Sequence, residues 1–337
     1  MKNFRNSFIS SVSLGTSIIP TSLLKRACSQ STILPFYHAI SDQDVPHIKN
    51  LYQPKKTKDF IKDLDFLLKH FNPIDYQEFK VLSETNKKNK KPSFLLSFDD
   101  GLSEFHEVIA PILLQKGIPA ICFLNSNFID NKDLFYRYKA SLLINELQKD
   151  SELDLKAKTL FSNTKSTTEN ILSIDYQNKD LLDKLAQLIN YDFKGFLLNE
   201  KPYLTSKQIK ALVTKGFSFG GHSIDHPEYQ YLEMQEQLKQ TKESIESICT
   251  NFCLDYKIFS FPFTDYKVSK EFFNQLKQNN IAETTFGSAG QKKDSIANNF
   301  QRIPFEMTNL SAKQILNSEL LYYLLKMPLG KNVIRRK

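Results

Sequence analysis

The sequence of 337 residues is poor in cysteine, with only Cys28, Cys122, Cys249 and Cys253. The last two stand four positions apart, but no second pair of thiols or imidazoles follows at the distance that a structural zinc site uses. We therefore expect core or surface thiols, and neither a disulfide scaffold nor a zinc-binding module.

A long apolar run is also missing. No stretch of about 18 apolar residues occurs, so no transmembrane helix is predicted. The N-terminus begins with Lys2 and Arg5, but serines and threonines interrupt the apolar stretch that follows, and Lys25 and Arg26 precede "ACSQ". These features disfavour a secretory signal peptide. The compartment stays open, with a cytoplasmic or membrane-peripheral location favoured over secretion.

Acidic residues are fewer than basic ones: 37 Asp and Glu stand against 45 Lys and Arg, for a net charge of +8. The excess gathers partly in 86–92, "NKKNKKP", and in 331–337, "KNVIRRK". No motif with interleaved aromatics accompanies these clusters, so we expect no nucleic-acid partner. One interpretation is a solvated loop and tail; the other is peripheral membrane contact through the basic termini.

The rest of the composition is that of a folded protein, with 41% hydrophobic and 24% charged residues. Short apolar stretches alternate with segments whose apolar residues recur every three or four positions, such as 57–70 and 228–251. This alternation predicts an α/β fold with a parallel sheet, open or closed into a barrel. The expected strands are 33–38, 93–98, 119–124, 217–219, 257–263, 282–286 and 300–305.

Between about 130 and 203 the sequence is polar, helix-prone and rich in Lys, Asn and Asp, which predicts a mostly helical insertion. Thr205 and Gln208 form a capping box at the start of the next helix. We divide the chain into an N-terminal extension (1–30), an α/β domain (31–310) and a C-terminal basic helix or tail (311–337).

Two stretches carry residues suited to chemistry. The strand at 93–98 runs into Asp99 and Asp100, and "FSFGGHSIDH" supplies His222 and His226. Because the carboxyl ends of parallel strands meet on one face, these side chains can meet there. A carboxylate and two imidazoles suit a zinc-like ion, and the second aspartate can then accept a proton from the attacking water. The alternative for the aspartates alone is a capping or turn role.

The spacing of the histidines alone is a weak signal, because helical metalloprotease motifs use it too. Here Ser223 occupies the position where those motifs have Glu, and Pro227 disfavours regular helix at His226. We therefore place the pair in a loop.

The sequence contains an opening "FYH" followed in order by "SFDDG", "GHSIDH" and "FSFPF". Together these motifs resemble the polysaccharide deacetylase (NodB homology) family of metal-dependent carbohydrate esterases. The resemblance runs from about 33 to 305, interrupted by the insertion. It implies a distorted (β/α) barrel, makes 31–310 the catalytic domain, and implies removal of acetyl groups from sugars. A bacterial origin fits the resemblance.

The resemblance also implies roles for single residues. Asp99 would be the general base, and the backbone N–H of Phe263, after the motif proline Pro262, would complete an oxyanion site. A divalent metal, with zinc expected, would be held by Asp100, His222 and His226.

The sequence departs from the family pattern in two places. Phe and Ser replace the Arg that many members have before the proline motif, and no histidine follows His226 to act as the usual C-terminal acid. His38 is our candidate general acid, with a packing role as the alternative. Arg302 is our candidate to orient Asp99, with a structural salt bridge as the alternative.

The leading hypothesis is a metal-dependent deacetylase acting on an N-acetylated sugar of a polysaccharide, oligosaccharide or lipid-linked glycan. A non-catalytic carbohydrate-binding relative that keeps the barrel is the alternative. A different metal hydrolase, such as a phosphoesterase, is a third class, but the richer carboxylate and histidine set typical of it is not evident.

Overall fold

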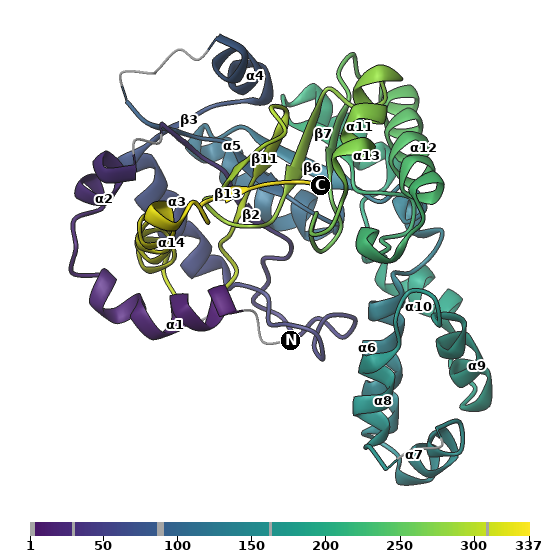
Figure 1. Ribbon diagram of the computed structural model, residues 1–337. Coiled ribbons are helices and arrows are strands. Elements are labelled where there is room, and N and C mark those ends of the chain that lie inside the picture. Colours follow the sequence, from purple (N-terminus) through teal and green to yellow (C-terminus); the bar gives the residue numbers. More distant parts are fainter. Residues whose placement is uncertain (1–3, 29–30, 86–90, 162–163, 308–309) are drawn as a thin grey trace.

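A barrel of eight parallel strands lies at the centre of the computed structural model (Figure 1). The structure describes residues 4–28, 31–85, 91–161, 164–307 and 310–337. From one edge to the other the strands are β11 (Asn299–Gln301), β9 (Thr284–Gly287), β8 (Ile258–Ser260), β7 (Ser218–Gly221), β6 (Ala120–Leu124), β5 (Leu96–Phe98), β2 (Pro35–Tyr37) and β12 (Ile303–Pro304). The predicted α/β barrel is confirmed.

One short segment nearly closes the barrel. Strand β11 pairs with β9 at one edge and β12 pairs with β2 at the other, although only Arg302 separates β11 from β12 in the chain. The single strand predicted at 300–305 is therefore two strands, because its halves pair with different neighbours. This split places Arg302 where the two edges of the sheet meet.

Helices surround the barrel and fill the space against it with aromatic side chains. The Phe98 ring packs against Phe60 and Phe105 with centroid distances of 6.1 and 5.1 Å, and all three side chains are buried. Such close packing holds the strand ends, and thus any site on them, in fixed positions. The surrounding elements are α3 (Thr57–His70), η1 (Phe105–Ile109), α5 (Ala110–Lys116), α11 (Ser206–Thr214), α12 (Met234–Phe252) and α13 (Lys270–Gln278).

Two local predictions have different outcomes. The capping box of Thr205 and Gln208 is present at the start of α11 and is confirmed. The helix predicted at 228–251 begins late, at Met234, after a separate 3-10 turn, η3 (Tyr229–Tyr231). The Gln237 amide donates to the carbonyls of Tyr229 and Leu232, so the turn is tied to α12 without being part of it.

The region 130–203 is helical, as predicted, and extends from one end of the barrel (Figure 1). Its helices enclose a second hydrophobic cluster that includes Leu143, Ile144, Leu182 and Leu185. The helices are α6 (Tyr136–Leu147), α7 (Ser151–Lys158), α8 (Thr167–Ser173), α9 (Asp180–Leu188) and α10 (Phe193–Glu200), after a 3-10 turn η2 (Ile129–Asn131).

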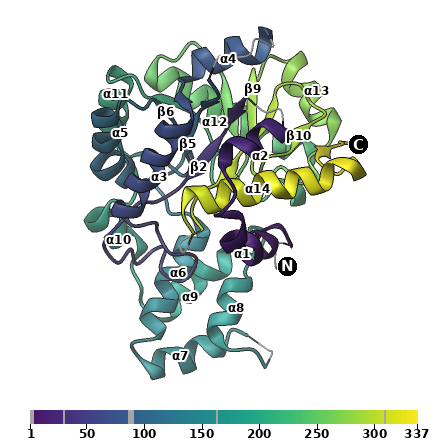
Figure 2. The same ribbon diagram turned by 90° about the vertical axis from the view of Figure 1, so that its left-hand side faces the viewer.

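The two ends of the chain form a layer on one side of the barrel, where α14 (Ala312–Lys326) packs on α1 (Phe4–Thr16) and α2 (Thr21–Cys28) (Figure 2). The C-terminal segment is tied down by Arg336, which makes ion pairs with Asp265 and Asp294. Residues 86–90 of the lysine cluster lie outside the described part of the chain. Among the described helices, none combines the length and apolar character needed to cross a bilayer.

Smaller elements complete the fold. The short strands β1 (Thr32–Ile33), β4 (Ser93–Phe94) and β3 (Asn72–Pro73) form a three-stranded sheet, and β10 (Lys293–Asp294) pairs with β13 (Val333–Ile334). Helix α4 (Tyr76–Thr85) follows β3.

Candidate metal and catalytic site

The two aspartates leave β5 through an abrupt turn. The Asp99 N–H still donates to the Tyr37 carbonyl as part of the sheet, whereas Asp100 has a φ of +71° and Gly101 a φ of +64°. The positive φ favours glycine at Gly101, and a Cβ there would lie 2.6 Å from Leu124 Cδ2, so the Leu124 side chain would have to shift. The turn therefore presents Asp99 and Asp100 in different directions.

The two histidines follow β7 in a loop, as predicted. The His222 N–H donates to the Leu124 carbonyl, and the His226 N–H donates to the Ser223 hydroxyl at 2.9 Å. Ser223 and His226 have φ angles of +72° and +64°, which no helix contains. Such strained backbone is typical of functional sites, where the surrounding structure must hold it.

Asp100, His222 and His226 converge on one point. Asp100 Oδ1 lies 3.2 Å from His226 Nε2 and 3.5 Å from His222 Nε2, and all three side chains are buried. One ligand atom from each residue lies within 4.8 Å of the other two. Within the described structure, Asp100 Oδ1 and His222 Nε2 make no hydrogen bond. Buried polar atoms without partners fit a divalent cation with carboxylate and imidazole ligands.

The surroundings of His222 prepare it for this role. Its Nδ1 lies 2.8 Å from the Ser260 carbonyl oxygen, an acceptor, so the proton belongs on Nδ1 and the lone pair on Nε2 faces Asp100. Burial lowers the pKa of His222 to about 4. The imidazole is therefore neutral at neutral pH, which is the form that binds metal.

Asp99 is held by Arg302 inside the barrel. The guanidinium donates from Nη1 to Asp99 Oδ1 and from Nη2 to Oδ2, each at 2.7 Å, and also contacts the hydroxyls of Ser97 and Ser260. Burial alone would raise the pKa of Asp99, but the positive charge of the Arg302 guanidinium outweighs it and holds the pKa below its ordinary value. The Asp99 carboxylate is thus ionised and fixed in orientation.

The site opens into a cavity of about 550 Å³ between the barrel and the insertion. His38 lies in its wall, with Nδ1 2.6 Å from Glu306 Oε1. Burial lowers the pKa of His38, but the Glu306 carboxylate overrides this and raises it to about 10.

Phe263 also lines the cavity, with a φ of +55° and its ring centroid 4.6 Å from that of His226. The Pro262 carbonyl accepts from the Thr264 N–H.

The insertion supplies residues to the site that sequence analysis missed. The buried Tyr138 hydroxyl, on α6, donates to Asp100 Oδ2 at 3.0 Å, and Phe135 and Arg137 line the cavity beside it. Nothing in the local sequence marks Tyr138, because the contact spans 38 positions and depends on how the insertion folds. Glu306, by contrast, lies four positions after the candidate residue Arg302, and this short separation is the sequence signal that points to it.

We expect Tyr138→Phe to weaken metal binding about tenfold, because Asp100 Oδ2 loses the hydrogen bond that orients the carboxylate. Competition against a chromophoric chelator measures the affinity. Tyr136→Phe removes a hydroxyl from the same helix and serves as the control, with affinity expected to stay at the wild-type value. Equal affinities for all three proteins would show that Tyr138 does not position Asp100.

A parallel α/β barrel with a buried carboxylate and two imidazoles at its strand ends defines a class of candidate metal-dependent hydrolases. Comparison with protein families assigns the chain within that class. The family model described as polysaccharide deacetylase matches residues 86–284, more than half of the sequence. The chain belongs to the polysaccharide deacetylase family.

Solved structures share the fold. A deacetylase from Streptococcus pyogenes, PplD, is 14% identical, with 86% of this chain and 97% of that chain covered and a TM-score of 0.56. IcaB from Ammonifex degensii is 12% identical over the same shares, with a TM-score of 0.55. The polysaccharide deacetylase BC0361 from Bacillus cereus is 14% identical, covers 86% and 69%, and has a TM-score of 0.52. No curated protein matches the chain.

Proposed function

We propose that the protein is a metal-dependent hydrolase that removes acetyl groups from N-acetylated sugars of a polysaccharide, oligosaccharide or lipid-linked glycan. The observation that carries the proposal is the pairing of a three-ligand cluster with a second, fixed carboxylate at one cavity of a polysaccharide deacetylase barrel. Metal ligation by Asp100, His222 and His226, with zinc as the metal, belongs to this proposal.

The reaction needs a water molecule to attack the acyl carbon. A divalent cation at the cluster would polarise the acyl carbonyl and make the water more acidic. Asp99 takes the proton from the attacking water, and Arg302 keeps the accepting carboxylate ionised and in place. The backbone N–H of Phe263, at the edge of the same cavity, would donate to the acyl oxygen as negative charge develops on it.

Breaking the carbon–nitrogen bond requires a proton for the departing amine. His38 is protonated at neutral pH because Glu306 stabilises its imidazolium, and it lines the cavity with Asp99 and Asp100. It would give its proton to the amine nitrogen, leaving acetate and the free amino sugar as products. This role fills the place of the absent C-terminal histidine.

We expect Glu306→Gln to move the alkaline limb of the kcat profile to lower pH by about one to two units. The amide no longer stabilises the imidazolium, so the pKa of His38 falls, and activity that needs protonated His38 is lost earlier as pH rises. Profiles of acetate release against pH measure the shift. Glu283→Gln, which removes a carboxylate paired with Lys80 elsewhere, is the control. An alkaline limb in the wild-type position would rule out His38 as the acid.

Acetate release from a panel of N-acetylated glycans, before and after chelation and with zinc added back, tests the function itself. Release that stops on chelation and returns with zinc supports the proposal. Metal binding without release from any glycan would favour a carbohydrate-binding relative that keeps the barrel. Absence of both would contradict the proposed site.

A further inference from the structure

Exposed apolar side chains gather on the layer formed by the two ends of the chain. The described residues include sixteen large apolar side chains that are exposed, and seven of these lie in α1, α2, the link between them, the end of α14 and the 3-10 turn η4 (Met327–Leu329). Ile18 is 84% exposed and Leu14 78%, more than any of the others. Clusters of this kind mark interaction surfaces. The seven are Phe4, Leu14, Ile18, Leu23, Leu325, Met327 and Leu329.

These side chains are exposed on a firmly packed scaffold. On the opposite face of α1, Arg5 makes a buried ion pair with Glu319, and the Thr16 hydroxyl lies 2.8 Å from the Ser318 hydroxyl. The Asn317 amide donates to the carbonyls of Thr16 and Ile19 at 2.9 Å. Helix α1 is thus docked on α14 by polar contacts that fix which residues face outward.

The two ends of the chain bring mostly basic side chains to the same layer, and the acidic Glu319 of α14 is buried against Arg5. Neither residues 1–41 nor residues 320–337 contain an aspartate or glutamate, whereas both stretches contain lysine and arginine. Lys326 of α14 lies over the Phe4 ring at 5.4 Å, so a cation and an exposed aromatic side chain are neighbours there. A surface that mixes exposed apolar side chains with an excess of basic ones complements an anionic lipid surface.

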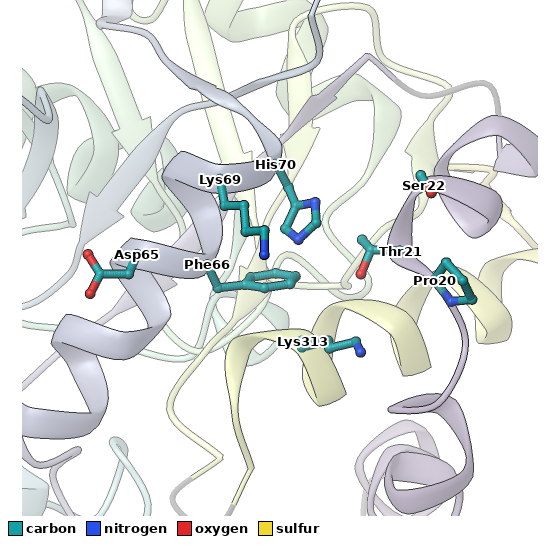
Figure 3. Close-up of a pocket in the computed structure, with 8 residues that line it drawn as sticks. All are labelled: Pro20, Thr21, Ser22, Asp65, Phe66, Lys69, His70 and Lys313. Atoms are coloured by element: carbon teal, nitrogen blue, oxygen red, sulfur yellow. The ribbon is translucent and has the colours of Figure 1, made fainter.

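A pocket of about 480 Å³ lies in this layer, between the start of α2, the end of α3 and α14 (Figure 3). Lys69, His70 and Lys313 line it, and Asp65 at its rim is paired with Lys116. Burial lowers the pKa of His70, and the nearby charges of Lys25, Lys69, Lys313 and Lys91 lower it further.

The first turn of α2 adds neutral donors to the pocket. Thr21 is 3% exposed, and its hydroxyl makes no hydrogen bond within the described structure. Figure 3 shows this hydroxyl directed toward the space between Phe66 and Lys313. The N-terminus of a helix also favours an anion, because its free N–H groups and dipole present positive charge. The buried hydroxyl and the helix terminus are therefore arranged for an acceptor such as a phosphate oxygen.

We propose that this layer docks on a bilayer containing anionic phospholipid, with Leu14, Ile18 and Leu23 entering the interface and a lipid phosphate bound in the pocket at the start of α2. Burial of aliphatic side chains distinguishes this partner from nucleic acid, whose backbone offers phosphates but no apolar phase. The proposal does not depend on the deacetylase activity, because the pocket shares no residue with the candidate catalytic cavity.

Sedimentation of the full chain with vesicles tests the proposal. We expect binding to vesicles of phosphatidylcholine mixed with phosphatidylglycerol, weak binding to phosphatidylcholine alone, and a loss of affinity with added salt. Ile18→Ser with Leu23→Ser removes the apolar contacts, and Lys69→Ala with Lys313→Ala removes pocket charge. Each pair should weaken binding about tenfold or more. Thr21→Val, which removes only the hydroxyl, should weaken it less.

Matched pairs elsewhere on the surface provide the controls. Leu155→Ser with Leu198→Ser replaces exposed leucines of the insertion, and Lys207→Ala with Lys210→Ala replaces exposed lysines of α11. Circular dichroism verifies that each variant is folded. The proposal is overturned if the wild type shows no preference for anionic vesicles, or if the control pairs weaken binding as much as the test pairs. If the wild type self-associates in solution but binds no vesicles, and the test pairs abolish the self-association, the layer is a protein contact instead.

Discussion

Replacing His222 with alanine is expected to abolish stoichiometric metal binding and to lower acetate release at least about 1,000-fold. His222 is one of three converging ligands, and its Nε2 has no hydrogen-bond partner within the described residues. Asp100 and His226 alone cannot complete the ligand set that a zinc-like ion requires. Metal content after dialysis and kcat/KM for acetate release measure the two effects together.

His106→Ala is the control for this experiment. His106 lies in η1, where its Nδ1 is 3.4 Å from the Gln208 amide, and it belongs to no metal cluster in the described structure. Its replacement should leave metal content and turnover at the wild-type level. If His222→Ala kept one metal per chain, the assignment of Asp100, His222 and His226 as ligands would be wrong.

The convergence of these three residues could be expected from the sequence, because parallel strands deliver their following loops to one face. Asp100 follows β5 and His222 follows β7, two strands that both pair with β6. Once the strands are correctly assigned, the ligands need no further information to meet. The strand positions could be read from short apolar stretches bounded by polar turns, but 33–38 and 93–98 were wrong as single strands, because each divides into two strands, β1 and β2 and β4 and β5, that pair in different sheets.

Contacts that do not follow from the order of the barrel strands could not be predicted in this way. Tyr138 reaches Asp100 only because the insertion packs against the mouth of the barrel, and nothing in its local pattern sets that orientation. The division of 300–305 into two strands was equally hidden, since the local sequence does not reveal that its halves pair with opposite edges of the sheet. Helix and strand propensities describe single segments, whereas the contact of Tyr138 and the division of 300–305 depend on how segments pack against one another.

Arg302 shows an intermediate case. The sequence lacks the arginine that many family members have before the proline motif, and Arg302 was only a candidate to replace it. In the structure, the segment that closes the barrel carries Arg302 into bidentate contact with Asp99. The need for a cation beside a buried carboxylate is predictable from charge burial alone. Which basic side chain pairs with the carboxylate depends on how the barrel closes.

The proposed base makes the other strong prediction. Asp99→Asn should lower kcat at least about 1,000-fold, because the isosteric amide cannot accept a proton from the attacking water. Metal content should stay close to that of the wild type, since Asp100, His222 and His226 are unchanged. Together these results would separate the base from the ligands, whereas loss of the metal in Asp99→Asn would reassign Asp99 as a ligand.

The same substitution should also destabilise the protein, because Arg302 is 1% exposed and Asp99 is its only carboxylate partner among the described ion pairs. Breaking a buried pair on one side leaves an uncompensated charge and costs about 3–5 kcal/mol in free energy of unfolding. Asp99→Asn with Arg302→Met removes both charges, so it should recover much of that stability without recovering activity. Denaturant unfolding and acetate release on the three proteins distinguish the two contributions. If the double variant regained turnover, Asp99 would act only as the partner of Arg302, and another group would have to accept the proton.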